Sequence, residues 1–175
     1  MTSQETNETR PLIVSAKIDD KAQQFFNAKR EQHFPPERNY LDAHLTLFHK
    51  LPAEEIETIK SQLEQAATQT PIIQAKTTDI MFMGFGSAYI IEAPDLCEMR
   101  KKLAQKWQMW LTPQDKNRFK PHVTFQNKVK ANIAEELYKT EKEIFEPFNL
   151  GIIALSLWHY NNGPWQHIKN YPLQK

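Results

Sequence analysis

The stretch "AHLTLFHK", residues 43–50, returns in altered form as "PHVTFQNK", residues 121–128. Each contains a histidine, an apolar residue, a threonine and a second apolar residue, in that order. Successive side chains of a strand point to opposite faces, so the histidine and threonine share one face and the apolar residues share the other. Each stretch therefore predicts a strand that packs one face on a core and turns its His–Thr face toward a cleft or solvent.

The two stretches also lie at equivalent places in a longer pattern. A strand over residues 12–16, a helix, a proline-containing loop, the first motif strand and a helix match a second series that starts with a strand over residues 89–92. We interpret this as an internal pseudo-repeat, with halves at about residues 11–83 and 87–175. Two such halves facing each other would place both motif strands near a pseudo-twofold axis, with a cleft between them.

The remaining elements follow from the spacing of apolar and turn-forming residues. Glycines between two strand-like runs predict a hairpin in the middle of the chain. Asp95 with Glu98, and Asn132 with Glu135, have the spacing of capping boxes and predict two helix starts. Helices are expected over residues 19–34, 52–67 and 95–111 and from residue 132 onward, and further strands over residues 72–84, 87–93, 150–160 and 165–173.

Composition sets broad limits on the kind of protein. The 175 residues carry 22 basic and 21 acidic side chains, and this balance excludes the chain-wide basic field that drives non-specific binding to duplex nucleic acid. The length fits one domain over residues 11–175, preceded by a polar, flexible arm at residues 1–10. The single cysteine, Cys97, with no leader and no long apolar run, favours a cytoplasmic protein that does not contact a membrane. A monomer is expected.

Two imidazoles across a cleft suit general acid–base chemistry on a phosphodiester. One ring takes a proton from the attacking oxygen and the other gives a proton to the leaving oxygen, and both roles are accessible because histidine titrates near neutrality. The candidate catalytic residues are therefore His44 and His122, with Thr46 and Thr124 donating hydroxyl hydrogen bonds to the non-bridging oxygens. This scheme requires no metal and no other cofactor. The pattern leaves open which histidine is the base and which is the acid.

Residues beside the motifs are candidates for substrate binding. Arg118 lies in the loop that enters the second motif and has the fork geometry that clamps a phosphate. Tyr40 lies in the loop that enters the first motif, and Phe48 follows that motif on the face of His44, so both are candidates to stack on a base. Core packing is the alternative for Phe48.

The paired strands of the form H-x-[ST]-apolar, about 80 residues apart, resemble those of the 2H phosphoesterases, in particular the 2′-5′ RNA ligase-like branch. "FKPHVTF" is the closest local match, and the likeness extends over nearly the whole chain after residue 10. The resemblance implies an α+β fold with two lobes, in which two mostly antiparallel sheets flanked by helices surround a central cleft. It also implies metal-independent hydrolysis of cyclic phosphodiesters, such as 2′,3′-cyclic phosphate RNA ends or nucleotides, or action on 2′-5′ linkages. The catalytic set carried across is His44, Thr46, His122 and Thr124.

A binding module is the alternative from a different functional class. Such a protein would use the same cleft to hold nucleotides or RNA ends without turnover. A phosphate pocket needs hydroxyl and cationic donors and gains little from two groups that titrate near neutrality. The two intact His–Thr pairs therefore favour an enzyme.

Overall fold

The computed structural model describes residues 9–175. Most of the predicted N-terminal arm, residues 1–8, lies outside the described residues. Its last residue is bound to the fold, because Arg10 Nη1 donates a hydrogen bond of 2.8 Å to Asn161 Oδ1. Across residues 9–175, no helix combines the length and the apolar character that a membrane crossing requires.

The order of strands and helices agrees with the repeating pattern seen in the sequence. Alternating burial along the strands and apolar stripes along the helices account for these elements. Short helices over residues 36–38 and 113–116 fall in loops that were predicted to be irregular, and residues 53–55, at the start of the helix predicted over residues 52–67, form a separate short helical segment. The elements are β1 (Leu12–Ile18), α1 (Asp20–His33), η1 (Pro36–Arg38), β2 (Leu45–Leu51), η2 (Ala53–Glu55), α2 (Ile56–Thr68), β3 (Ile73–Phe82), β4 (Ser87–Glu92), α3 (Pro94–Lys106), α4 (Pro113–Lys116), β5 (His122–Gln126), α5 (Ala131–Ile144), β6 (Asn149–Tyr160) and β7 (Trp165–Pro172).

The predicted α+β class is confirmed, and where two antiparallel sheets were expected the strands form two parts of one continuous seven-stranded antiparallel sheet. The strand order is β2-β1-β6-β3-β4-β5, and β7 pairs with β6 outside this path. The long strand β6 joins the parts because its first residues pair with β3 and the rest pairs with β1 and β7. The strands at the two ends of the order, β2 and β5, nevertheless approach each other, with Cα atoms within 8 Å. The sheet must therefore curl so that its ends meet.

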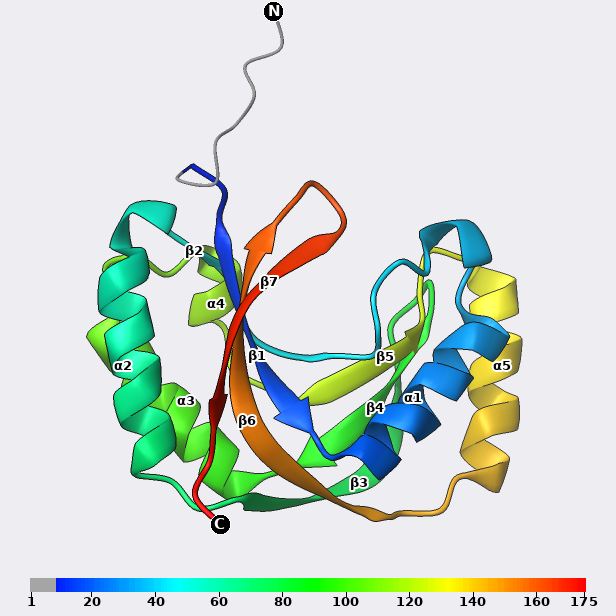
Figure 1. Ribbon diagram of the computed structural model, residues 1–175. Coiled ribbons are helices and arrows are strands. Elements are labelled where there is room, and N and C mark those ends of the chain that lie inside the picture. The colour runs from blue at the N-terminus through cyan, green and yellow to red at the C-terminus, as the bar shows by residue number, and fades with distance from the viewer. Residues whose placement is uncertain (1–8) are drawn as a thin grey trace, which may run out of the picture.

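The helices cover the outer sides of this curled sheet. Figure 1 shows α2 and α3 on one side of the molecule and α1 and α5 on the other, with the strands between them. Helix α1 follows β1 in the chain but packs against β5, at the opposite end of the sheet. Buried apolar residues from both sides of the molecule belong to one connected core.

Both predicted capping boxes are wrong. Helix α3 begins one residue earlier than predicted, with Ala93 as N-cap and Pro94 in its first turn, so Asp95 lies inside the helix. Proline is favoured at this first position because it lacks the N–H group that a helix start leaves unpaired. Helix α5 begins at Ala131 with Lys130 as N-cap, and no side chain caps it.

A β-bulge follows each His–Thr motif. In the β1–β2 ladder, Ser15 pairs with Thr46 and Val14 pairs with Phe48, so the intervening residue of β2 has no partner. In the β4–β5 ladder the same skip occurs after Thr124, because the next paired residue of β5 is Gln126. A bulge bends its strand and interrupts the alternation of side chains. The two motifs therefore end in the same local distortion.

Candidate active site

The two motif histidines are held in the same way. His44 Nδ1 lies 2.8 Å from the carbonyl oxygen of Asp42, and His122 Nδ1 lies 2.8 Å from the carbonyl oxygen of Lys120. A carbonyl oxygen only accepts hydrogen bonds, so Nδ1 of each ring carries a hydrogen and donates it. Nε2 of each ring therefore has the lone pair in the neutral form and can accept or return a proton.

The fold brings the two motifs together from opposite ends of the sheet. Each histidine lies at the start of its strand, His44 just before β2 and His122 at the first position of β5. These two strands approach each other, and a charge on His122 acts on the protonation of His44. The side chains of Thr46 and Thr124 are partly exposed, whereas the apolar residues between each His and Thr are buried. The structure thus brings together the four residues predicted to be catalytic.

His44 has an aromatic neighbour that changes its chemistry. The ring of Trp165 lies 4.5 Å from the ring of His44. Burial of His44, opposed by its hydrogen bond to the carbonyl of Asp42 and supported by the nearby charge of Arg30, lowers its pKa from 6.5 to about 4. At neutral pH His44 is therefore an uncharged imidazole with a free Nε2.

A cavity of about 610 Å³ adjoins His44. Strands β1 and β6 each contribute a serine to its wall, and β6 and β7 each contribute a tryptophan. Trp158 and Trp165 lie with their ring centroids 5.9 Å apart, and Trp158 Nε1 donates a hydrogen bond to Ser15 Oγ. The wall thus combines apolar ring faces with hydroxyl and amide groups. Prominent lining residues are Tyr40, Asp42, Trp158, Trp165, His167 and Asn170.

The structure separates the three residues predicted to bind substrate. Tyr40 is about half exposed and lines the cavity beside His44. Arg118 lines a different cavity, between α3 and the loop that enters β5. The substrate-binding role predicted for Phe48 is wrong, because Phe48 is fully buried and packs edge-on against Trp107. The bulge after Thr46 explains the error, since it turns Phe48 to the core instead of the face of His44.

Several residues of the site were not identified from the sequence. Trp165 and His167 stand two apart on β7 and line the cavity together, so the same strand spacing that revealed the motifs could have indicated them. Arg30 gave no such signal, because its position on α1 reaches the site only through the crossing of that helix to β5. Within residues 9–175, no group of three or more His, Cys, Asp or Glu side chains is arranged to hold a metal ion.

A third imidazole lies farther along β2. His49 Nδ1 lies 2.9 Å from Asp115 Oδ1, and the same carboxylate accepts hydrogen bonds from the backbone N–H groups of His49 and Lys50. Asp115 is almost fully buried. Burial alone would raise the pKa of its carboxyl, but these hydrogen bonds outweigh burial and hold the pKa below 3.8. Asp115 therefore ties the end of β2 to α4.

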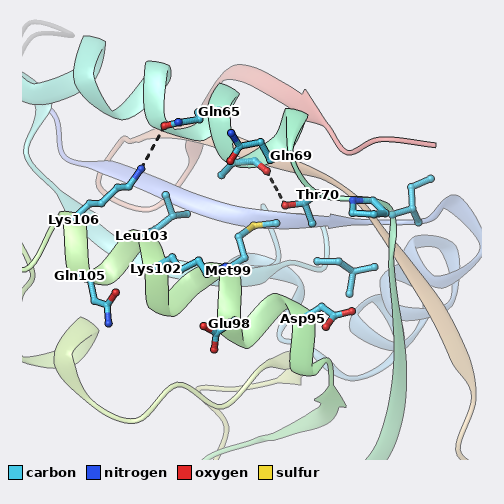
Figure 2. Close-up of a pocket in the computed structure, with 14 residues that line it drawn as sticks. Gln65, Gln69, Thr70, Asp95, Glu98, Met99, Lys102, Leu103, Gln105 and Lys106 are labelled. Atoms are coloured by element: carbon cyan, nitrogen blue, oxygen red, sulfur yellow. Dashed lines mark hydrogen bonds between the residues drawn. The ribbon is translucent and has the colours of Figure 1, made fainter.

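A larger cavity lies elsewhere in the molecule. It has a volume of about 730 Å³ and lies between α2 and α3 (Figure 2). Its wall combines apolar residues with glutamines, lysines and two acidic residues of α3, and it contains no histidine. Figure 2 shows Lys106 bridging the groove to Gln65. Size alone would have selected this cavity, whereas the smaller one has the motif residue His44 in its wall.

Comparison with known proteins places this geometry in a family. The model of the 2′-5′ RNA ligase superfamily matches residues 18–164, which include both motifs. The chain belongs to this superfamily. The resemblance to 2H phosphoesterases of the 2′-5′ RNA ligase-like branch is thereby confirmed, and membership supports a phosphoesterase- or ligase-type enzyme. No match was found among curated proteins.

Solved structures with the same fold extend over the whole domain. TT0787 of Thermus thermophilus has a TM-score of 0.68 and 14% identity, and the match covers 94% of this chain and 98% of that chain. LigT of Escherichia coli in complex with 3′-AMP has a TM-score of 0.63 and 16% identity, and the match covers 95% of this chain and 99% of that chain. LigT has also been crystallised with ATP, with a TM-score of 0.57 and 16% identity, and that match covers 95% of this chain and 99% of that chain. These similarities show a shared fold.

Proposed function

We propose that this protein is a metal-independent phosphodiesterase that opens cyclic phosphodiesters, such as 2′,3′-cyclic phosphates of nucleotides or RNA ends, or acts on 2′-5′ linkages. The observation that carries the proposal is the pair of histidines, each fixed through Nδ1 by a carbonyl two residues earlier, at the place where β2 and β5 approach each other. Two oriented imidazoles can supply both proton transfers of a phosphodiester cleavage.

His44 is the general base in this proposal and His122 is the general acid. Because its pKa is lowered to about 4, His44 is neutral at pH 7 and its Nε2 can take a proton from an attacking water. His122 in its protonated form gives a proton from Nε2 to the leaving ribose oxygen. His44 gains one proton and His122 loses one, so the reaction is balanced in protons. After the product leaves, His44 releases its proton and His122 takes one up, and the site returns to its starting state. Thr46 and Thr124 donate hydroxyl hydrogen bonds to the non-bridging oxygens as negative charge builds on them.

The cavity beside His44 supports a nucleotide or an RNA end as substrate. The faces of Trp158 and Trp165 and the ring of Tyr40 offer surfaces on which a base can stack, and the neighbouring hydroxyl and amide groups can bind ribose oxygens. Nucleotide binding is known for LigT through its 3′-AMP and ATP complexes. The proposal keeps the expectation of a cytoplasmic monomer that uses no cofactor.

The test compares the wild type with His44→Ala and His122→Ala on 2′,3′-cyclic nucleotides and on an RNA oligomer that ends in 2′,3′-cyclic phosphate. EDTA is present throughout, and the 2′- and 3′-phosphate products are resolved. We expect the wild type to turn over and each variant to lose on the order of 10²- to 10⁴-fold in rate. His159→Ala is the matched control, because His159 lacks the motif and does not line the cavity.

Binding of the same nucleotides is measured in parallel. Loss of turnover with retained binding in both variants would support catalysis by the two histidines. If the folded wild type binds the nucleotides and turns over none of the cyclic phosphates, the enzyme proposal is rejected and the cleft is that of a binding module.

A further inference from the structure

Two buried arginines occupy corresponding places in the two halves of the molecule. Arg30 lies on α1, the helix after the first strand, and Arg100 lies on α3, the helix after β4. Their exposed fractions are 3% and 8%. Neither guanidinium forms an ion pair with a carboxylate among residues 9–175. Burying a charge without such a partner is costly, so their positions require an explanation.

Arg30 connects the second motif strand to the loop before the first motif. Its Nη1 donates a 3.0 Å hydrogen bond to the carbonyl oxygen of Thr124, and its Nε donates a 3.1 Å hydrogen bond to Asn39 Oδ1. Its guanidinium also lies over the ring of Phe34, 4.1 Å from the centroid. Thr124 belongs to the candidate catalytic set, and Asn39 lies five residues before His44.

Arg100 makes the mirror connection. Its Nε donates a 3.2 Å hydrogen bond to the carbonyl oxygen of Leu47, the residue after Thr46, and its Nη2 donates a 2.6 Å hydrogen bond to the carbonyl oxygen of Asp115. Asp115 lies in the segment before the second motif. The guanidinium lies over two rings, 4.6 Å from the centroid of Phe48 and 5.1 Å from the centroid of Phe119.

The two sets of contacts follow one rule. Each arginine binds a backbone carbonyl of the motif strand in the opposite half, and each binds the segment that precedes the motif of its own half. The strands concerned, β2 and β5, are the two ends of the sheet order and have no ladder between them. Hydrogen bonds through a rigid guanidinium fork fix both distance and direction better than apolar packing does.

We propose that Arg30 and Arg100 are positioning residues that set the separation and orientation of the two histidine strands, each by binding the strand of the opposite half. The inference rests on the proposed function for its catalytic consequence, but the arrangement of the strands can be measured without turnover. Arg30 has an additional effect, because its positive charge lies close enough to His44 to oppose protonation of that ring.

The test uses Arg30→Met, Arg100→Met, Arg30→Lys and Arg100→Lys. Methionine retains much of the length and volume without charge, whereas lysine retains the charge but cannot form two hydrogen bonds in fork geometry. We expect kcat to fall on the order of 10- to 100-fold in all four variants while KM changes much less, because the reacting groups are displaced and the base-binding wall is intact. Arg38→Met is the matched control, since Arg38 is an exposed arginine of η1.

Nuclear magnetic resonance supplies a readout that does not depend on activity. The Arg30→Met variant should raise the pKa of His44 and shift the ring signals of His122, whereas Arg30→Lys should preserve the pKa of His44 and still reduce kcat. If Arg30 had a merely structural role, its variants would lose thermal stability, but the pKa of His44 and kcat would not respond differently to methionine and to lysine. In the wild type, the guanidinium protons of Arg30 and Arg100 should exchange with solvent much more slowly than those of Arg38, and this result does not require any variant to fold.

Two results would overturn the proposal. One is a folded pair of methionine variants whose kcat stays within twofold of wild type and whose histidine signals do not move. The other is fast solvent exchange at both buried guanidinium groups in the wild type. If the wild type shows no turnover but the exchange and titration results are as expected, the proposed function fails and the positioning role stands.

Discussion

The ring of Trp165 lies 4.5 Å from that of His44, and His122 has no comparable aromatic contact among residues 9–175. The motif gives both histidines the same hydrogen bond through Nδ1, whereas the ring that covers His44 comes from β7, outside either motif. A neutral imidazole is suited to accept a proton, which is why His44 takes the role of base in the proposed reaction.

Removing the cover from His44 should change its titration. In the Trp165→Ala variant, water reaches the ring, so its pKa should rise from about 4 toward the ordinary 6.5. Trp165→Phe retains an aromatic ring and should keep the pKa low. The measurement is a histidine ring titration by nuclear magnetic resonance, and equal titration curves in the alanine variant and the wild type would contradict the role of Trp165.

The same lowered pKa predicts how stability depends on pH. Between about pH 6.5 and about pH 4 the unfolded chain binds a proton at His44 and the folded protein does not. Lowering the pH through this window therefore favours the unfolded state, and this ring lowers the free energy of unfolding. Urea unfolding at successive pH values should show that the free energy of unfolding falls less across this pH window in Trp165→Ala than in Trp165→Phe.

The activity profile has its own acidic limit. A general base must be unprotonated, so kcat/KM should fall as the pH drops below the pKa of His44, about 4. In Trp165→Ala this acidic limb should move to higher pH, together with the ring titration. An acidic limb that stays in place while the His44 titration moves would assign the base to another group.

The bulge after Thr46 decides what Phe48 contributes. Phe48 contacts Trp107 and Arg100 in the core, so Phe48→Ala should lower the free energy of unfolding by about 3–5 kcal/mol. Tyr40→Ala, at a half-exposed position on the cavity wall, should change it by only about 0.5 kcal/mol and should instead weaken nucleotide binding. Denaturant unfolding and a binding titration separate the two residues. A binding defect in a fully stable Phe48→Ala variant would restore the original assignment.

Asp115 should act as a structural connection between β2 and α4. Asp115→Ala leaves the N–H groups of His49 and Lys50 without their acceptor and should cost about 2 kcal/mol or more. Because its pKa is lowered, Asp115 adds stability above about pH 3.8 that is lost as the pH falls through its folded pKa. Thermal unfolding of Asp115→Ala is compared with Asp95→Ala, an exposed aspartate of α3 that should have little effect.

These elements also show which features of the fold and of the site the sequence predicts and which it does not. Periodic apolar residues correctly predicted the strands around His44 and His122 and the four long helices, because burial on one face is a local pattern. The bulges were invisible, since a bulge is defined by the partner strand, and Phe48 was therefore assigned to the wrong face. The spacing of Trp165 and His167 could have marked one face of β7, but the contact of Trp165 with His44 depends on the pairing of β7 with β6.

The connections across the molecule suggest that its two halves unfold together. Helix α1 leaves its own half to pack on β5, and β6 pairs with strands on both sides. We propose that residues 11–175 form one cooperative domain. Tryptophan fluorescence, which reports only the side of α3, β6 and β7, and far-ultraviolet circular dichroism should then give coincident urea transitions. Two separated transitions would show independent halves.

The order of elements predicted the pseudo-repeat, but this exchange of helices between halves was not predictable. Sequence spacing specifies which residues of a helix are buried and not which sheet buries them. Arg30 and Arg100 illustrate the limit, because each was an unremarked arginine within an amphipathic helix until its contact with the opposite strand was known.

The curled sheet has a consequence for the behaviour of the protein in concentrated solution. The end strand of a sheet normally presents unpaired backbone groups onto which a strand of another molecule can add, and such additions lead to aggregation. Here the end strands β2 and β5 approach each other, and the outward backbone groups of Leu47, His49 and Thr124 are occupied by Arg100, Asp115 and Arg30. These contacts with β2 and β5 therefore also blunt two edges that would otherwise be prone to aggregation.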